Sequence, residues 1–436
     1  MMTYEQALTY LDSLGVFGSR PGLERIEGLL ELMGRPERNY KTIHVTGTNG
    51  KGSTTAFCTA VLTAAGVRTG MYTSPHLTDY RERMIIDGAP ISPEEFGHAV
   101  GRARELADRM VAEGFDQPTE FEVLTAAAFY HFAVAKVEYA VIEVGLGGLL
   151  DSTNVITPAA AVITNVALEH TDRCGSTLAE IATHKGGIVK PRVPVVTAAR
   201  GEALNIIYDR AEELSAPLFV LDRDFFVQSK GEKSLRQYLT VRTNQYGNIT
   251  GLATRLLGLH QAENCALAVM TAKLLAQKDG RLTDDAIRRG VENACWPARF
   301  EILGAAPDII VDAAHNPAGA RALKQALTDR YGDSPVIFLF GVLADKDVIG
   351  MIDALITARD AVVTVAPLSE RAMAAADLAM LIQAGRVEDS PTVADGLAKA
   401  VEWAGPAGIV CVCGSLYMVG VARSLLLNVP NNASPL

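Results

Sequence analysis

A glycine-rich turn between an apolar run and a helical segment constrains the fold of this chain more than any other feature. Residues 44–54 read HVTGTNGKGST and join the apolar run TIHV to an alanine- and threonine-rich stretch. A strand, a glycine loop and a helix in this order are the setting of a phosphate-binding loop. Glycines let backbone N–H groups turn toward phosphate oxygens, and the helix N-terminus adds partial positive charge. We therefore predict an α/β fold built around a bound phosphate.

The loop departs from the usual pattern G-x-x-x-x-G-K-[ST] at two positions. Val45 stands in place of the first glycine, and Gly52 stands where a hydroxyl residue should follow the lysine. Lys51 would bring a positive charge to the β- and γ-phosphates, and either Ser53 or Thr54 would bring a hydroxyl to Mg²⁺. The residues expected around the phosphates of ATP are Gly47, Thr48, Asn49, Gly50, Lys51, Gly52, Ser53 and Thr54.

Short β-branched runs alternate with helical periodicity, which predicts βα units and a mainly parallel sheet. Strands are expected at 41–46, 67–73, 139–145, 160–166, 193–198 and 217–221. Helices are expected at about 51–65, 93–112, 120–136, 176–190, 201–214, 260–277 and 283–293. Residues 223–258 are polar, turn-rich and alternating, so we expect an antiparallel hairpin or a small edge sheet there.

A second α/β series follows Trp296 and Pro297, with strands expected at 308–314, 335–341, 361–366 and 408–413. The 436 residues exceed the size at which single cores stop growing, roughly 250–300 residues. We therefore expect a P-loop parallel-sheet ATPase domain over residues 1–295, followed by a smaller Rossmann-like α/β domain over residues 296–436. A cleft between two such domains is where a ligand would bind.

Composition excludes several classes of function. The net charge of −10 argues against a nucleic-acid surface, and no apolar run approaches the roughly 18–20 residues that span a bilayer. The first 15 residues lack a basic region before an apolar stretch, so we expect a cytoplasmic protein. Six cysteines without a C-x-x-C pair are expected to be buried free thiols. No apolar surface stripe suggests an oligomer, so we expect a monomer.

A collinear series of motifs along nearly the whole chain resembles folylpolyglutamate synthase/dihydrofolate synthase, a branch of the Mur ligase superfamily. The phosphate loop with glycine after its lysine is similar to the loop of that branch. The other motifs are YLDSLGVFGSRPGLERIEGLL (10–30), TSPHL (73–77), RERM (81–84), PTEFEVLTAAAF (118–129), EVGLGGLLDSTNV (143–155), ITNVALEH (163–170), HKGGIVKP (184–191), GLHQAENCALA (258–268), WPARFEIL (296–303), DAAHNPAG (312–319), GVLADKD (341–347) and CGSLY (413–417).

The resemblance implies an ATP-dependent ligase that adds L-glutamate to a folate. A substrate carboxylate would attack the γ-phosphate to give an acyl phosphate and ADP, and the amine of glutamate would then displace phosphate. The carboxylate would be the γ-carboxyl of a reduced folate such as tetrahydrofolate, the benzoate of dihydropteroate, or both. Mg²⁺ would be bound at two sites.

The same resemblance implies roles for individual residues. Glu143 ends an apolar strand, where a carboxylate faces the ligand crevice of a parallel sheet. The implied catalytic residues are Lys51, Glu143, His170 and Lys185, the last in carbamylated form. The implied Mg²⁺ ligands are Ser53, Ser74, Glu143 and His170. Asn264, Arg299, Asp312 and His315 would contact the nucleotide, and Thr119, Phe121 and Ser415 would contact the other substrates. Read alone, His170 could be structural, Lys185 an unmodified lysine, and Phe121 a core residue.

The chain departs from the commonest wording of the family at three positions. Leu149 stands where arginine is expected, Glu169 where aspartate is expected, and His184 where glutamate precedes the key lysine. Leu149 would remove a cation from a loop near Glu143, and the missing charge would be replaced by one of Arg81, Arg83 and Arg173 or not at all.

These departures keep other functions open. One alternative is a nucleotide-binding homologue with weakened catalysis, and another is a ligase of the same superfamily with a different carboxylate acceptor. A Mur peptidoglycan ligase would place a UDP-binding domain before the loop, and the 46 residues before Gly47 are too few for it. A P-loop kinase would have no use for a second domain that supplies Arg299, Asp312 and His315.

Overall fold

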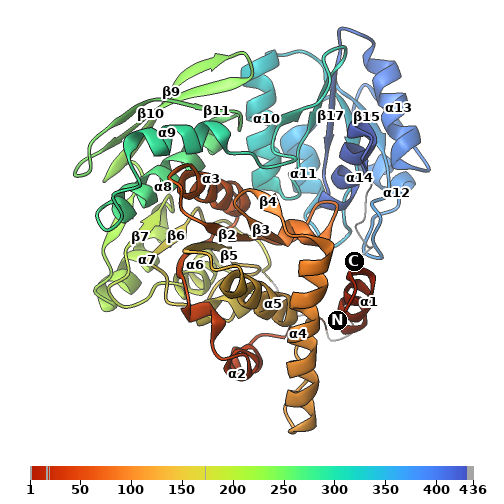
Figure 1. Ribbon diagram of the computed structural model, residues 1–436. Coiled ribbons are helices and arrows are strands. Elements are labelled where there is room, and N and C mark those ends of the chain that lie inside the picture. The colour runs from red at the N-terminus through yellow and green to blue at the C-terminus, as the bar shows by residue number, and fades with distance from the viewer. Residues whose placement is uncertain (1, 16–17, 19, 172, 430–436) are drawn as a thin grey trace.

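The computed structural model describes residues 2–15, 18, 20–171 and 173–429, so the motif at 10–30 lies partly outside the described residues. Three sheets organise this part of the chain (Figure 1). The first has eight strands in the order β4-β3-β2-β5-β1-β6-β7-β8. Their bounds are β1 Lys41–Thr46, β2 Thr69–Tyr72, β3 Met84–Ile86, β4 Ala89–Pro90, β5 Tyr139–Glu143, β6 Ala160–Ile163, β7 Val195–Thr197 and β8 Leu218–Val220.

The six strands from β2 to β8 in this order are parallel, as predicted, and β3 and β4 extend the edge as an antiparallel hairpin that the sequence did not indicate. Val45 of β1 lies opposite Glu143 of β5, and Thr46 lies opposite Ile163 of β6. Since parallel neighbours end at the same edge of a sheet, the segments that follow β5, β1 and β6 meet there.

Helices cover both faces of this sheet. On one face α3 (Lys51–Ala64) packs against α8 (Leu259–Ala276) and α9 (Asp284–Asn293), and alternate strand residues such as Ile43 and Val141 point into their core. The opposite face is covered by α1 (Tyr4–Leu14), α2 (Glu24–Leu32), α4 (Pro93–Ala112), α5 (Glu120–Val134), α6 (Leu178–Gly186) and α7 (Gly201–Glu213). The sheet is therefore buried on both faces, which explains its continuous apolar strands.

Residues 225–254 form the small antiparallel sheet expected in the polar segment. Its strands are β9 (Phe225–Lys233), β10 (Arg236–Thr243) and β11 (Ile249–Thr254), paired in the order β11-β10-β9. Figure 1 shows this sheet over α8 and α9, away from the eight-stranded sheet. Its inward residues Leu239 and Val241 join the same core as α3.

The third sheet has six strands in the order β12-β13-β17-β14-β15-β16. All pairings except β12 with β13 are parallel. One face carries α10, α11 and α12, and the other carries α13 and α14. The bounds are β12 Glu301–Ile302, β13 Asp308–Val311, α10 Pro317–Tyr331, β14 Ile337–Phe340, α11 Val348–Leu355, β15 Ala361–Thr364, α12 Ala375–Leu381, β16 Arg386–Asp389, α13 Val393–Ala404, β17 Ile409–Cys413 and α14 Leu416–Leu427.

The α/β prediction is confirmed, with local errors. The helix expected at 176–190 ends at Gly186, and Pro191 follows shortly afterwards, where it would interrupt a continued helix. Strands β12 and β16 were not predicted, since each is short and polar. Five cysteines are buried and free as expected, but Cys295 is exposed. No helix within the described ranges is long and apolar enough to cross a membrane.

Adjacent phenylalanines test the packing of the small sheet on α8. Phe225 is 0% exposed and belongs to the core shared with α3 and α8, whereas Phe226 is 40% exposed. Phe225→Ala should lower the free energy of unfolding by about 3–5 kcal/mol, and Phe226→Ala should change it by about 0.5 kcal/mol or less. Thermal melts of both variants measure this. Equal melting temperatures would contradict the assigned core.

Candidate active site

The glycine loop at residues 47–50 is held by the segment that follows β6. Asn49 donates its backbone N–H to Asn165 Oδ1 at 2.9 Å, and its carbonyl accepts from Thr164 Oγ1 at 2.6 Å and from Asn165 Nδ2 at 3.0 Å. Thr48 N–H donates to the Asn165 carbonyl at 2.9 Å. The loop is therefore fixed by neighbouring chain rather than by a ligand, so it is organised to receive phosphate.

Two glycines of the loop have structural reasons to be glycine. Gly50 caps α3 with φ +84°, and a Cβ there would collide with Asn264 Oδ1. Gly52 replaces the usual hydroxyl residue because Trp296 covers it, with indole atoms 2.7–2.8 Å from where a Cβ would lie. The unusual glycine after the lysine thus makes room for a tryptophan that follows α9.

The cationic side chain of the loop folds back over it. Lys51 Nζ donates to the carbonyls of Gly47 and Thr48, each at 3.1 Å. Of the two candidate hydroxyls, Ser53 Oγ accepts from Gln261 Nε2 at 3.2 Å and lines a cavity, whereas the Thr54 hydroxyl is buried without a partner among the described residues. Ser53 is therefore the hydroxyl that a ligand can reach.

Three cavities adjoin this loop, and we name each after a helix. The α10 cavity is about 230 Å³, the α5 cavity about 770 Å³ and the α3 cavity about 690 Å³. Ser74 and Pro75 line both the α5 and the α3 cavity, and Arg299 lines both the α3 and the α10 cavity. The three cavities therefore adjoin one another, and loop residues line the α10 cavity (Asn49, Gly50 and Ser53) and the α3 cavity (Gly52).

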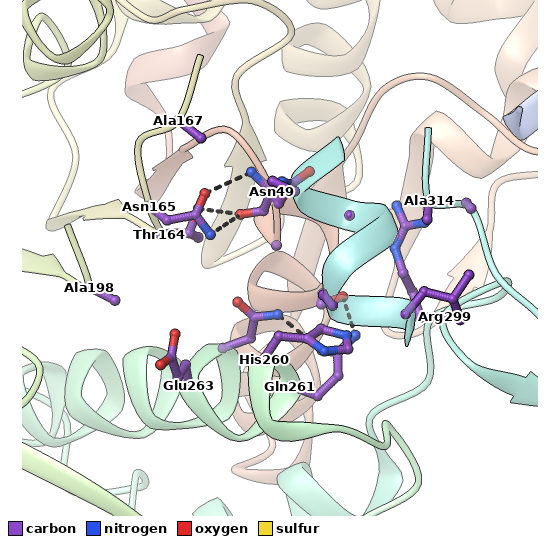
Figure 2. Close-up of a pocket in the computed structure, with 18 of the residues that line it drawn as sticks. Asn49, Thr164, Asn165, Ala167, Ala198, His260, Gln261, Glu263, Arg299 and Ala314 are labelled. Carbon is purple, nitrogen blue, oxygen red and sulfur yellow. Dashed lines mark hydrogen bonds between the residues drawn. The ribbon is translucent and has the colours of Figure 1, made fainter. Parts of the chain in front are cut away.

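The α10 cavity gathers most of the residues predicted to contact a nucleotide. Asn49, Gly50, Ser53, Asn264, Arg299, Asp312 and His315 all line it. Figure 2 shows Asn49 and Asn165 on one side, His260, Gln261 and Glu263 from α8 below, and Arg299 with Ala314 on the far side. Residues more than 200 positions apart in the chain thus share one concave site.

Asp312 and His315 contribute less directly than expected. Both carboxylate oxygens of Asp312 accept backbone N–H groups, from Phe300 and Ala314, each at 2.8 Å. His315 Nδ1 lies 2.9 Å from the Ala313 carbonyl, and its Nε2 lies 3.5 Å from Glu169 Oε1. Asp312 therefore shapes the turn that presents His315, while His315 reaches across to the segment after β6.

Glu143 is a buried acid at the edge of the α3 cavity. Burial raises its pKa to about 7, although the charges of Lys51 and Arg299 oppose the rise. The hydrogen bond found for its carboxylate is a long one, 3.4 Å from the Ser74 N–H. A buried carboxylate with so little hydrogen bonding suits a cation or a protonated state.

Lys185 lies in α6 and is only 5% exposed. Burial lowers its pKa to about 7, the charge of Lys51 lowers it further, and Glu169 opposes the shift. A substantial fraction of this amine is therefore neutral and nucleophilic near neutral pH. Lys185 lines none of the three cavities.

The α5 cavity contains Thr119, Phe121 and His170 of the predicted set. Thr119 caps α5, and its hydroxyl exchanges hydrogen bonds with Glu122 at 3.0 and 3.3 Å. Phe121 is half-buried and packs against Tyr72 with ring centroids 6.2 Å apart. The α5 cavity is lined by the cationic residues Arg20, Arg173, Lys346 and Arg371 and by the acidic residues Glu120, Asp151, Glu169, Asp345 and Asp347. An aromatic surface beside charges of both signs suits a flat ligand that carries polar groups.

Leu149 stands where a cation was expected, and the structure shows which arginine could supply that charge instead. Leu149 is exposed, lines none of the three cavities, and donates its N–H to the His184 carbonyl at 2.8 Å. Neither Arg81 nor Arg83 lines any of the three cavities, so neither replaces the missing cation there. Arg173 does line the α5 cavity.

Some predicted residues are not brought to a cavity. Gly47, Thr48, Lys51 and Thr54 form or underlie the loop without lining any of the three cavities, and buried Ser415 also lines none of them. The hydroxyl of Ser415 lies among the buried atoms without a partner within the described residues. The substrate role of Ser415 remains a prediction.

Sequence reasoning missed several residues that organise the site. Asn165 holds the loop, Gln261 joins Ser53 to Asn264, Trp296 covers Gly52, and Asn316 contacts both Asn49 and Glu169. Each lies within a motif already quoted. The motifs therefore contained these residues, but one sequence does not show which side chains form hydrogen bonds with one another across the fold.

Comparison with known proteins agrees with this geometry. The Mur ligase middle domain matches residues 45–272, and the Mur ligase glutamate ligase domain matches residues 298–416. Dihydrofolate synthase/folylpolyglutamate synthase of Bacillus subtilis is 35% identical over 431 residues, covering 97% of this chain and 99% of that protein. A Mycobacterium tuberculosis folylpolyglutamate synthase structure with ADP and AMPPCP has a TM-score of 0.88 at 33% identity, covering 99% of this chain and 100% of the other.

A solved FPGS complex with AMPPCP and folate has a TM-score of 0.84 at 34% identity. The match covers 98% of this chain and 100% of that one. The likeness therefore extends over both large sheets.

Replacement of Lys185 tests its environment through the pH dependence of stability. The folded pKa of about 7 lies below the ordinary value of 10.5, so the unfolded chain binds the proton more tightly. Lys185→Met should therefore stabilise the protein by about 3–5 kcal/mol below pH 7, where the amine is charged in both states. That gain should fade as pH rises toward 10.5, where the amine is neutral in both states.

Thermal melts from about pH 6 to about pH 10 in bicarbonate-free buffer measure the difference between wild type and variant. The exposed Lys278→Met is the matched control and should show no such gain. A gain that grew with pH, or none at all, would contradict the proposed burial of Lys185.

Proposed function

Because this chain belongs to the folylpolyglutamate synthase/dihydrofolate synthase family of Mur ligases, we propose that its three adjoining cavities hold ATP, a folate acceptor and glutamate around one glycine loop. The chain is an ATP-dependent ligase that adds glutamate to folates. The observation that carries the residue assignments is the convergence of the glycine loop, Glu143 and the segment after β6 at one sheet edge.

We assign the nucleotide to the α10 cavity. The loop N–H groups and the α3 N-terminus would hold its phosphates, as anions are held at helix N-termini. Arg299 lines both this cavity and the α3 cavity, so its guanidinium could contact the γ-phosphoryl group on either side of the transfer step. His315 and Asn264 would bound the rest of the nucleotide.

We assign Mg²⁺ to the oxygen donors beside the loop. Mg²⁺ prefers oxygen ligands and usually takes one or two carboxylates together with substrate phosphates. Glu143 fits because it is a buried carboxylate whose hydrogen bonding is incomplete, and the Ser53 hydroxyl is open to the α10 cavity. We place a second ion at Ser74 and His170, which both line the α5 cavity. Bound Mg²⁺ would neutralise phosphate charge during transfer.

No group of three His, Cys, Asp or Glu side chains in the described part of the chain could hold a metal without further ligands. Substrate oxygens would therefore complete each coordination shell.

We propose that Lys185 carries a carbamate. A neutral amine attacks CO₂, forms a C–N bond and loses a proton, so a cation becomes an anion. The lowered pKa of Lys185 supplies the neutral amine near neutral pH. An anion there would be balanced by Lys51, which now depresses the pKa of Lys185.

We propose that the reaction proceeds through an acyl phosphate. The acceptor carboxylate forms a bond to the γ-phosphorus while the bond to the ADP oxygen breaks. The amine of glutamate then attacks the acyl carbon, loses a proton, and displaces phosphate. Bound substrates would have to displace water from the cavities, because water would otherwise hydrolyse the acyl phosphate.

We assign the pterin and benzoate end of the acceptor to the α5 cavity, where Phe121 can stack on a flat ring. Its cations would balance the acceptor's carboxylates, with Arg173 in place of the cation absent at Leu149.

We also propose that the chain divides into domains at residues 295 and 296. Cys295, Trp296 and Arg299 line the α3 cavity, so this division would place the linker beside the site.

An assay with two acceptors tests these assignments. Purified protein with ATP, Mg²⁺ and glutamate should add one glutamate mass to tetrahydrofolate, to dihydropteroate, or to both. Lys51→Ala should lower turnover at least about 100-fold, because the phosphates lose the positive charge of the lysine. The melting temperature of this variant should stay near that of wild type. Product from neither acceptor, or full activity of Lys51→Ala, would contradict the assignment.

Labelled bicarbonate tests the carbamate. With carbon-isotope-labelled bicarbonate, wild type should show a carbamate carbonyl NMR signal that is absent from Lys185→Met. Activity should fall in bicarbonate-free buffer and return when bicarbonate is added. A signal that persisted in Lys185→Met, or activity independent of bicarbonate, would show that Lys185 acts unmodified.

A further inference from the structure

Asn316 belongs to the six-stranded half of the fold and forms hydrogen bonds with the glycine loop, and the sequence motifs gave it no role. It stands between His315 and Pro317, at the N-cap of α10, and its side chain is buried. Its Oδ1 accepts the Gly319 N–H at 2.7 Å, which caps the helix. A helix cap alone would explain an asparagine here.

The Nδ2 group of the same side chain forms two hydrogen bonds that helix capping does not require. Asn316 Nδ2 donates to Asn49 Oδ1 at 3.0 Å and to Glu169 Oε1 at 2.8 Å. Asn49 Nδ2 returns a longer hydrogen bond of 3.4 Å to Asn316 Oδ1. Both Nδ2 hydrogens and both Oδ1 lone pairs are therefore in use, so the side chain has one orientation.

The two partners of Nδ2 belong to the phosphate-binding half of the site. Asn49 is part of the glycine loop, and its backbone is fixed to Thr164 and Asn165. Glu169 precedes His170, the assigned ligand of the second Mg²⁺. The neighbouring His315 also approaches Glu169, with its Nε2 3.5 Å from Glu169 Oε1, so two adjacent residues of the six-stranded half contact the same carboxylate.

We propose that Asn316 is a positioning residue that aligns the six-stranded half on the glycine loop for phosphoryl transfer. Through one amide it fixes α10, the loop and the segment bearing His170 relative to one another. It thereby sets the position of His315 and Arg299 against the phosphates without touching them itself. This proposal rests on the ligase function proposed above and adds to it the residue that couples the two halves.

Asn316→Asp separates this role from capping. Aspartate caps helices as well as asparagine does, so α10 should stay capped. It cannot donate to Glu169, and it places two carboxylates in contact. We expect kcat to fall about 10–100-fold, because misplacement by about 1 Å costs that much, while the KM for ATP changes less than about three-fold.

A reversed hydrogen bond provides the rescue. In Asn316→Asp/Glu169→Gln, the amide of the glutamine can donate to the aspartate, so the bridge re-forms with donor and acceptor exchanged. The double variant should therefore be at least about five-fold more active than Asn316→Asp alone, whereas Glu169→Gln alone should not raise kcat, a non-additivity expected of residues in one hydrogen-bond network. Thr392→Ala removes the cap of α13 in the same half and is the matched control, with kcat unchanged.

Wild-type turnover in the same assay shows that the ligase function holds, so a failure of the present proposal is separable from a failure of that function. Wild-type kcat in Asn316→Asp would overturn the proposal. A double variant no more active than Asn316→Asp would also overturn it. If Asn316→Asp does not fold, Asn316→Ser, which keeps a cap but is too short to reach Glu169, is judged by the same kcat criterion.

Discussion

The parallel pairing of β5, β1 and β6 is the constraint on which the rest of the structure depends. Because these three strands end at one edge, Glu143, the glycine loop and the segment from Thr164 to His170 are neighbours although they lie far apart in sequence. Hydrogen bonds from Thr164 and Asn165 then fix the loop before any phosphate arrives. The six-stranded half closes the site from the opposite side through Arg299, His315 and Asn316.

Charge at the site is controlled locally, against the overall net charge of −10. Burial shifts Glu143 and Lys185 in opposite directions, so the pKa of each lies at about 7. Each group can therefore change its charge when a ligand brings new charges close, since neither forms an ion pair with another residue in the part of the chain that the structure describes. A pKa near 7 at both groups suits the acyl-phosphate intermediate proposed above, whose formation and breakdown would change the charge beside them.

The sequence was sufficient for the parts of the fold that local rules specify. Alternation of β-branched runs with helical periodicity and the glycine loop predicted both α/β halves, and the polar alternating segment predicted the antiparallel sheet. It was not sufficient where one residue serves another across the fold. Residue 52 is a glycine because Trp296 lies where a side chain would be. The carboxylate of Asp312 accepts hydrogen bonds from the backbone N–H groups of Phe300 and Ala314. Asn316 lay inside a recognised motif, yet its partners are known only from the folded chain.

The central claim is that the acceptor's carboxylate, not water, takes the γ-phosphoryl group beside this loop. The most direct measurement is the fate of oxygen from an acceptor whose terminal carboxylate carries a heavy oxygen isotope. If the carboxylate attacks phosphorus, one labelled oxygen should appear in the released inorganic phosphate, with one label kept in the new amide. Unlabelled phosphate formed together with the amide product would contradict the account, because phosphate would then have formed without an acyl phosphate.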